Sequence, residues 1–207
     1  MTAASISAQQ VKALRDQTGS GMMDSKRALQ ATSGDLEKAK DWLRQKGMAR
    51  AGTKSVRVAQ EGLVEIYLHH NHQLGVLVEL NSETDFVART EAFRELAHEI
   101  AVHVAAASPR FLNRDDVPPA LVEGTRETIR AQAVAQKKPE AVIEKIVDGK
   151  LKEFYKREVL LEQPWAKDDS RTVDEVLKEA VASFGENVTI ARFARFKVQD
   201  EAADGRN

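Results

Sequence analysis

The stretch GVLVELNSETDFVARTEAF, from Gly75 to Phe93, joins two different hydrophobic patterns. Its first six residues are almost all apolar, which favours a buried strand. From Phe93 onward the apolar residues recur at the spacing of one helical face: Phe93, Leu96, Ala97, Ile100, Ala101 and Val104. Asp85 and Phe86 stand between the two patterns. Since an unpaired carboxylate is costly to bury, we expect one of these two side chains to face water or a partner.

A second strand pattern comes just before this stretch. Val64, Ile66 and Leu68 alternate with Glu65 and Tyr67, which predicts a half-buried strand with the apolar residues on its inner face. A short polar loop then leads to Gly75, so the two strands are expected to form a hairpin.

The N-terminal part has helical periodicity. Residues 5–47 are predicted to form three short helices, of which the first ends near Thr18 and the second near Gly34. Trp42 anchors the small core, and Gly47 is predicted to end the third helix. The polar and basic segment 48–60 is predicted to be a linker.

The C-terminal part continues with helical patterns over 119–161, a helix that begins after Thr172, and a last strand over 188–198. The expected fold class is α+β, with a three-stranded antiparallel sheet packed on helices. The expected domains are a three-helix head (1–47), a linker (48–60), an α+β core (61–199) and a disordered tail (200–207).

Composition excludes several classes of protein. Among 207 residues, 31 Lys and Arg stand against 32 Asp and Glu, and a net charge of −1 argues against a broad basic surface for nucleic acid. Without cysteine, neither a disulfide framework nor a thiolate metal site can form. The N-terminus lacks a signal-peptide pattern, and no apolar run approaches the ~18 residues of a membrane span. We therefore expect a cytoplasmic protein that does not enter a membrane.

Motifs of common enzymes, such as a P-loop or a nucleophile elbow, are missing from the sequence. His69, His70 and His72 could bind zinc, but a hairpin places neighbours on opposite faces, and a polar turn explains them as well. Glu83 and Asp85 could be an acid/base pair, but no nucleophile or oxyanion donor accompanies them. We expect neither an enzyme nor a bound cofactor or metal.

Two adjacent methionines, Met22 and Met23, stand at the connection between the first two predicted helices. Thioether side chains adapt to irregular binding surfaces, but they also fill cores. So small a head can hardly bury both beside Trp42, so we expect at least one to be exposed.

Four motifs resemble the bacterial elongation factor Ts family. They are LRDQTGSGMMDSKRAL (14–29), GVLVELNSETDFVA (75–88), LLEQPWAKD (160–168) and FGENVTIARFARF (184–196). The resemblance runs in the family's order from about residue 7 to residue 199. The chain is similar to the family's short form, which lacks a second core subdomain and a long coiled-coil insertion. Short members can dimerise, and the sequence leaves a homodimer open.

The resemblance implies a nucleotide exchange factor for the GTPase elongation factor Tu. Its head would be a ubiquitin-associated-type domain that contacts the nucleotide-binding domain of Tu through Arg15, Met22 and Met23. A second element would intrude beside the magnesium site of Tu and loosen GDP, namely Thr84, Asp85, Phe86 and Val87. Because that magnesium belongs to the partner, no cofactor is implied here. The alternative is an adaptor whose head binds partner helices or ubiquitin-like folds, but it leaves Thr84–Val87 and the C-terminal motifs unexplained.

Overall fold

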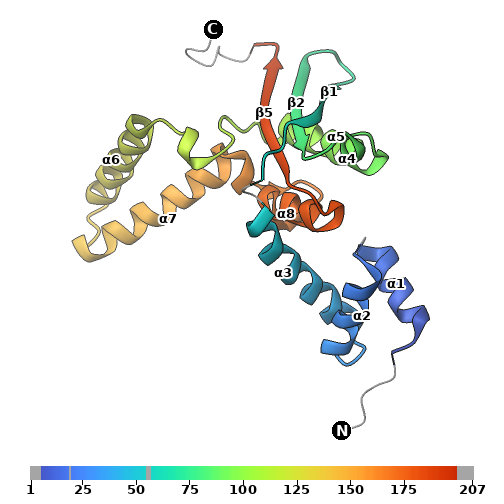
Figure 1. The fold of residues 1–207 in the computed structure, drawn as a ribbon. Helices are drawn as coiled ribbons and strands as arrows, with labels where there is room; N and C mark the ends of the chain where they lie inside the picture. Colours follow the sequence, from blue (N-terminus) through green and yellow to red (C-terminus); the bar gives the residue numbers. More distant parts are fainter. Residues whose placement is uncertain (1–5, 19, 55–56, 200–207) are drawn as a thin grey trace. The chain divides into compact units, whose positions relative to one another are not determined.

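A computed structural model describes residues 6–18, 20–54 and 57–199 (Figure 1). The chain forms two compact units that alternate along the sequence. The first contains the described residues of 1–63, 80–93 and 175–189, and the second those of 64–79, 94–174 and 190–207. The predicted tail, 200–207, lies outside the described residues.

Three helices form the N-terminal part, as predicted: α1 (Ala8–Thr18), α2 (Met22–Ala31) and α3 (Leu36–Lys54). Their shared core consists of Val11, Leu14, Ala28, Leu29 and Ala39, with Ile6, Leu36, Trp42 and Leu43 packed against it. Gly34 follows α2 with a φ of 86°, and its N–H donates to the carbonyl of Leu29 at 2.8 Å. Such a left-handed residue ends a helix, and glycine adopts it without steric cost.

The prediction that Gly47 ends the third helix is wrong, because α3 continues to Lys54. Part of the predicted linker, up to Lys54, is therefore helical. Gly47 has a different reason to lack a side chain. A Cβ at this position would lie 2.9 Å from the Cβ of Ala182 on α8 (Val173–Phe184), closer than such atoms approach in real proteins. The glycine permits a close helix contact.

A three-stranded antiparallel sheet is formed by β1 (Glu61–Leu68), β2 (Leu74–Ser82) and β5 (Val188–Lys197), in the order β1-β2-β5. Helix α5 (Glu91–Ala107) packs against it (Figure 1). The buried residues of β2 and α5 include Val76, Val78, Leu80, Phe93, Ala97, Ile100, Ala101 and Val104. These elements confirm the predicted α+β class and the helical stripe from Phe93.

The predicted alternation of β1 is present, but the expected inner face is wrong. Val64, Ile66 and Leu68 are 58%, 67% and 54% exposed, whereas Glu65 and Tyr67 are half-buried. Glu65 Oε1 lies 3.0 Å from Nδ1 of His98 on α5, and the Tyr67 ring lies edge-on to the same imidazole. β1 is an edge strand, and its helix-facing side meets this polar neighbour, so the apolar residues turn outward.

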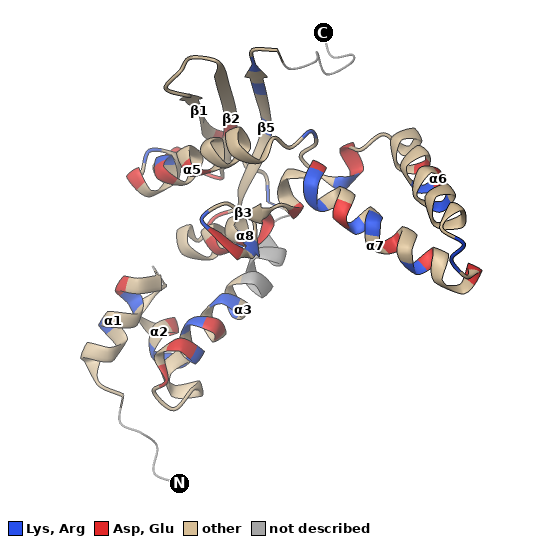
Figure 2. Ribbon diagram, turned by 180° about the vertical axis from the view of Figure 1, so that it is seen from behind, with Lys and Arg blue, Asp and Glu red and all other residues tan. Residues whose placement is uncertain are grey.

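Two long helices, α6 (Pro119–Ala135) and α7 (Glu140–Glu158), form a hairpin. Their shared core is Ile129, Ala133, Ile143, Val147 and Leu151. Figure 2 shows acidic and basic residues interspersed along α7. A small hairpin that the sequence did not predict, β3 (Pro164–Trp165) with β4 (Asp168–Thr172), precedes α8. No helix among the described residues is long and apolar enough to cross a membrane.

Candidate partner-binding site

The short helix α4 (Asp85–Ala88) presents the Asp-Phe pair directly after β2. Phe86 is 83% exposed, while Ala88 at the end of the turn is buried. The side chain of Asp85 is 43% exposed and forms an ion pair with Arg89 at 2.9 Å, one helical turn later. An exposed pair of this kind contributes little stability. Phe86 is therefore the side chain that faces out of the protein.

Glu186 holds the residue that precedes this turn. Thr84 has extended backbone angles, as expected at a helix N-cap. Its backbone N–H donates to Oε2 of Glu186 at 3.0 Å, and its hydroxyl donates to Oε1 of the same carboxylate at 2.7 Å. The Thr84 carbonyl in turn accepts a hydrogen bond from the hydroxyl of Ser82 at 2.9 Å. Both backbone polar groups of Thr84 are thus fixed.

Glu83 makes the reciprocal contact. Its Oε1 accepts the backbone N–H of Asn187 at 2.7 Å, and its Oε2 lies 3.5 Å from the guanidinium of Arg57. Asn187 is buried, and its side-chain amide donates to the backbone carbonyl of Arg57 at 2.7 Å. Glu83 and Asp85 thus have separate partners, and the structure does not bring them together as an acid/base pair.

Sequence reasoning did not single out Glu186, because 102 residues separate it from Thr84. It lies inside the motif FGENVTIARFARF, so the resemblance pointed to its segment without giving it a role.

The head residues are exposed at the start of α2 and on α1. Met22 and Met23 are 48% and 60% exposed, which confirms that at least one faces solvent. The Arg15 side chain is also accessible and pairs with Asp16 at 3.1 Å. Two exposed thioethers form an adaptable surface of the kind that recurs at binding patches.

The three histidines lie at the β1–β2 turn. Nδ1 of His69 lies 2.9 Å from the Tyr67 hydroxyl, and the rings of His69 and His70 are 4.2 Å apart. The described residues contain no group of three His, Cys, Asp or Glu side chains placed to hold a metal ion.

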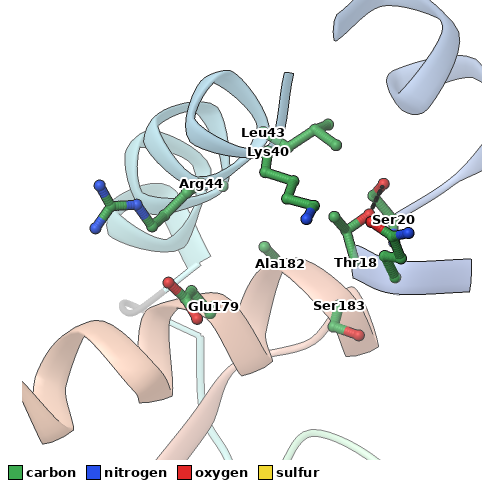
Figure 3. A pocket seen from close by; sticks show the side chains of 10 residues that line it. Thr18, Ser20, Lys40, Leu43, Arg44, Glu179, Ala182 and Ser183 are labelled. Atoms are coloured by element: carbon green, nitrogen blue, oxygen red, sulfur yellow. Dashed lines mark hydrogen bonds between the residues drawn. The ribbon is translucent and has the colours of Figure 1, made fainter. Parts of the chain in front are cut away.

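A pocket of about 280 Å³ lies beside α1, α3 and α8 (Figure 3). Lys40 extends in it toward Thr18 and Ser20, whose hydroxyls are 2.7 Å apart. Lys40 pairs with Glu37, and Arg44 pairs with Asp41. No residue of α4 and neither Met22 nor Met23 is among the residues that line this pocket.

Known proteins identify the family. The family model described as Elongation factor TS matches residues 45–200. The chain belongs to the elongation factor Ts family. Elongation factor Ts of Syntrophomonas wolfei is 51% identical over 93% of this chain and 90% of its own length. The corresponding proteins of Coprothermobacter proteolyticus and Thermosipho melanesiensis are 52% and 51% identical, over 92% and 93% of this chain and 97% and 98% of their own lengths.

Family membership makes the chain a translation elongation factor of protein biosynthesis. Its three N-terminal helices fit a ubiquitin-associated-like head. The separation into the domains expected above stays a prediction, as do the roles of Arg15, Met22, Met23 and Thr84–Val87.

Proposed function

We propose that this elongation factor is the guanine nucleotide exchange factor of elongation factor Tu and acts in the cytoplasm. The observation that carries the proposal is Phe86, which is 83% exposed on a turn fixed by charged side chains. An exposed aromatic residue on a rigid support is the kind of anchor that dominates an interface. Because the turn is already ordered, little binding free energy is lost in ordering it.

In the proposed mechanism, Thr84–Val87 enters beside the magnesium site of Tu. Phe86 inserts between apolar elements of Tu, and Asp85 competes for the polar contacts that hold the metal and the phosphates. No bond is made or broken. Binding of the factor and binding of GDP to Tu are thermodynamically linked. The factor therefore raises the dissociation constant of GDP by the same ratio by which GDP raises that of the factor. Release then proceeds through a short-lived ternary complex, from which GTP displaces the factor.

The head supplies a second contact in this proposal. Met22 and Met23 pack on the nucleotide-binding domain of Tu, and Arg15 pairs with an acidic or carbonyl group there. Their exposure supports this role. The head provides affinity, while Phe86 provides the disturbance of the nucleotide.

The experiment follows release of fluorescent GDP from purified elongation factor Tu with the wild-type protein and with Phe86→Ala. We expect strong acceleration by the wild type and a loss of roughly 30-fold or more in the variant, the size of a hot-spot truncation. Acceleration that survives in the variant would move the mechanism to Asp85 or the head. No acceleration by the wild type would overturn the exchange function and favour the adaptor.

We also propose that two copies of the chain pair through the exposed face of the sheet. Val64, Ile66 and Leu68 share this face with Leu77, which is 40% exposed. On β5, Arg192 reaches Glu79 at 2.7 Å, and Phe196, 72% exposed, lies on the same face by alternation. Apolar side chains over three strands make a self-complementary patch, and sheets stack face to face at about 10 Å.

Sedimentation of wild type and Ile66→Lys tests this pairing. We expect a concentration-dependent dimer for the wild type and a monomer for the variant, since a lysine would be desolvated in the interface. Val134→Lys is the matched control, because Val134 is 54% exposed on α6, which is not part of the sheet. A wild type that stays monomeric at all concentrations would refute the pairing.

A further inference from the structure

The side chain of Phe86 is 83% exposed, so packing against the rest of the protein does not orient it. Its position therefore depends on the backbone of α4, a helix of only 4 residues. An isolated turn of this length does not persist without support, since helix nucleation is unfavourable. Something outside the turn must hold it in place.

The support is not the usual helix cap. An N-cap threonine normally accepts a hydrogen bond from the first turn with its side-chain oxygen. Within the described residues, Thr84 makes no such bond, and its hydroxyl is directed to Glu186 Oε1 at 2.7 Å. The Thr84 N–H reaches the other oxygen of the same carboxylate at 3.0 Å. The side chain of Glu186 therefore holds the backbone at the residue before α4 begins.

The connection between α8 and β5 places this carboxylate. Gly185 has a φ of 76°, a left-handed conformation that ends α8 and turns the chain toward β5. Glu186 and Asn187 follow and exchange hydrogen bonds with Glu83 and Thr84: Glu186 accepts from the N–H of Thr84, and Glu83 accepts from the N–H of Asn187. Charge-assisted bonds in both directions resist displacement better than one contact.

We infer that Glu186 is a positioning residue for nucleotide exchange, which it serves by holding the Thr84–Val87 turn in the orientation that presents Phe86. This inference rests on the proposed exchange function. Glu186 touches neither nucleotide nor metal in this role, and acts only through the turn. Removing it leaves Phe86 in the chain but releases the backbone that carries it.

Three substitutions separate this role from others. Glu186→Ala removes both acceptors of the Thr84 N–H and hydroxyl. Glu186→Gln keeps an oxygen for the N–H, and its amide can donate to the hydroxyl oxygen, because a hydroxyl rotates to accept. Glu144→Ala is the control for loss of a glutamate side chain elsewhere, since Glu144 pairs with Arg130 on the α6–α7 hairpin.

The first readout is GDP release from elongation factor Tu as a function of factor concentration. For Glu186→Ala we expect a maximal rate lowered about tenfold or more, as for loss of charged hydrogen bonds. Glu186→Gln is expected to stay within about threefold of wild type, and Glu144→Ala to equal it. A merely misfolded fraction would raise the half-saturating concentration and leave the maximal rate intact.

The second readout, hydrogen exchange of the Thr84 amide, needs no partner. We expect protection in wild type and Glu186→Gln, and fast exchange in Glu186→Ala. The positioning role would be overturned if Glu186→Ala left the maximal rate of GDP release unchanged, or if Glu186→Gln were as slow as Glu186→Ala. In either case, an active wild type would still support the exchange function. A wild type without activity would instead refute the exchange function itself.

Discussion

Two phenylalanines in the same stretch of sequence have opposite environments. Phe93 is fully buried, and its ring packs edge-on against Phe184 with centroids 5.8 Å apart. Phe86 is 83% exposed on the preceding turn. Phe93 belongs to the periodic stripe of α5, whereas Phe86 belongs to no stripe. The difference teaches that helical periodicity identified the phenylalanine that serves the fold, and that the one outside the stripe, Phe86, is left exposed to a partner.

The largest expected effect is on stability at Phe93. Phe93→Ala removes a fully buried ring and leaves a cavity, so we expect a loss of about 3–5 kcal/mol in the free energy of unfolding. Urea denaturation followed by circular dichroism measures it.

Phe86→Ala is the matched variant for this comparison. It should change the free energy of unfolding by less than about 0.5 kcal/mol, as exposed positions do. Equal losses in the two variants would show that Phe86 also serves the fold, and the comparison would fail.

A smaller effect is expected at Gly47, where the fold leaves no room. Its Cβ would meet that of Ala182 at 2.9 Å, so we expect Gly47→Val to cost about 1–3 kcal/mol through overpacking. Thermal unfolding of this variant and of the double variant with Ala182→Gly measures the effect. If the double variant regains the stability of the wild type, the loss arises at the α3–α8 contact. If Gly47→Val alone is as stable as the wild type, the two helices move apart without loss of stability.

The sequence predicted most of this fold because its helices are strongly periodic. The stripe from Phe93 to Val104 is buried as expected except for Leu96, which is half-buried, and Val188–Lys197 is a strand. The end of the third helix was wrongly predicted at Gly47, because a glycine can mark either the end of a helix or a close approach of another helix. Only the tertiary contacts distinguish these two cases. The inner face of β1 was wrongly predicted, because an alternating pattern defines two faces of a strand but does not show which face a helix covers.

The candidate site was predictable in part for the same reason. Phe86 stood out because it broke a pattern next to an acid, and the motifs supplied its role. Glu186 did not stand out, because its contact with Thr84 depends on how two distant loops meet. Local patterns identify exposed anchors, but the residues that hold them require the folded chain.

The two methionines of the head are intermediate in exposure between the two phenylalanines. Met22 and Met23 are about half exposed, between the extremes of Phe86 and Phe93. We expect Met22→Ala and Met23→Ala each to weaken binding of nucleotide-free elongation factor Tu by about 1 kcal/mol, or roughly fivefold, with unfolding nearly unchanged. Calorimetric titration measures the affinity. If unfolding suffers more than binding, the methionines belong to the core of the head.

The smallest effect is expected at His103, a buried polar residue that serves the fold. Its ring stacks on Trp165, and Nδ1 accepts the backbone N–H of Ala166 at 3.2 Å. Nε2 therefore carries the hydrogen and donates it to Oε1 of Gln163 at 3.0 Å. Burial lowers the pKa of His103 below its ordinary value of 6.5, and the hydrogen bond to Gln163 only partly opposes this.

The sign of the pH dependence follows from that direction. Because the folded state binds the proton more weakly than the unfolded state, stability is complete above about pH 6.5 and falls as the pH drops toward the lowered pKa. Urea denaturation between pH 7.5 and 5 should show this fall in wild type, and a smaller one in His103→Gln, which keeps polar groups but cannot titrate. Identical slopes in His103→Gln and wild type would mean that the buried ring takes up its proton without cost, against the geometry of the Ala166 contact.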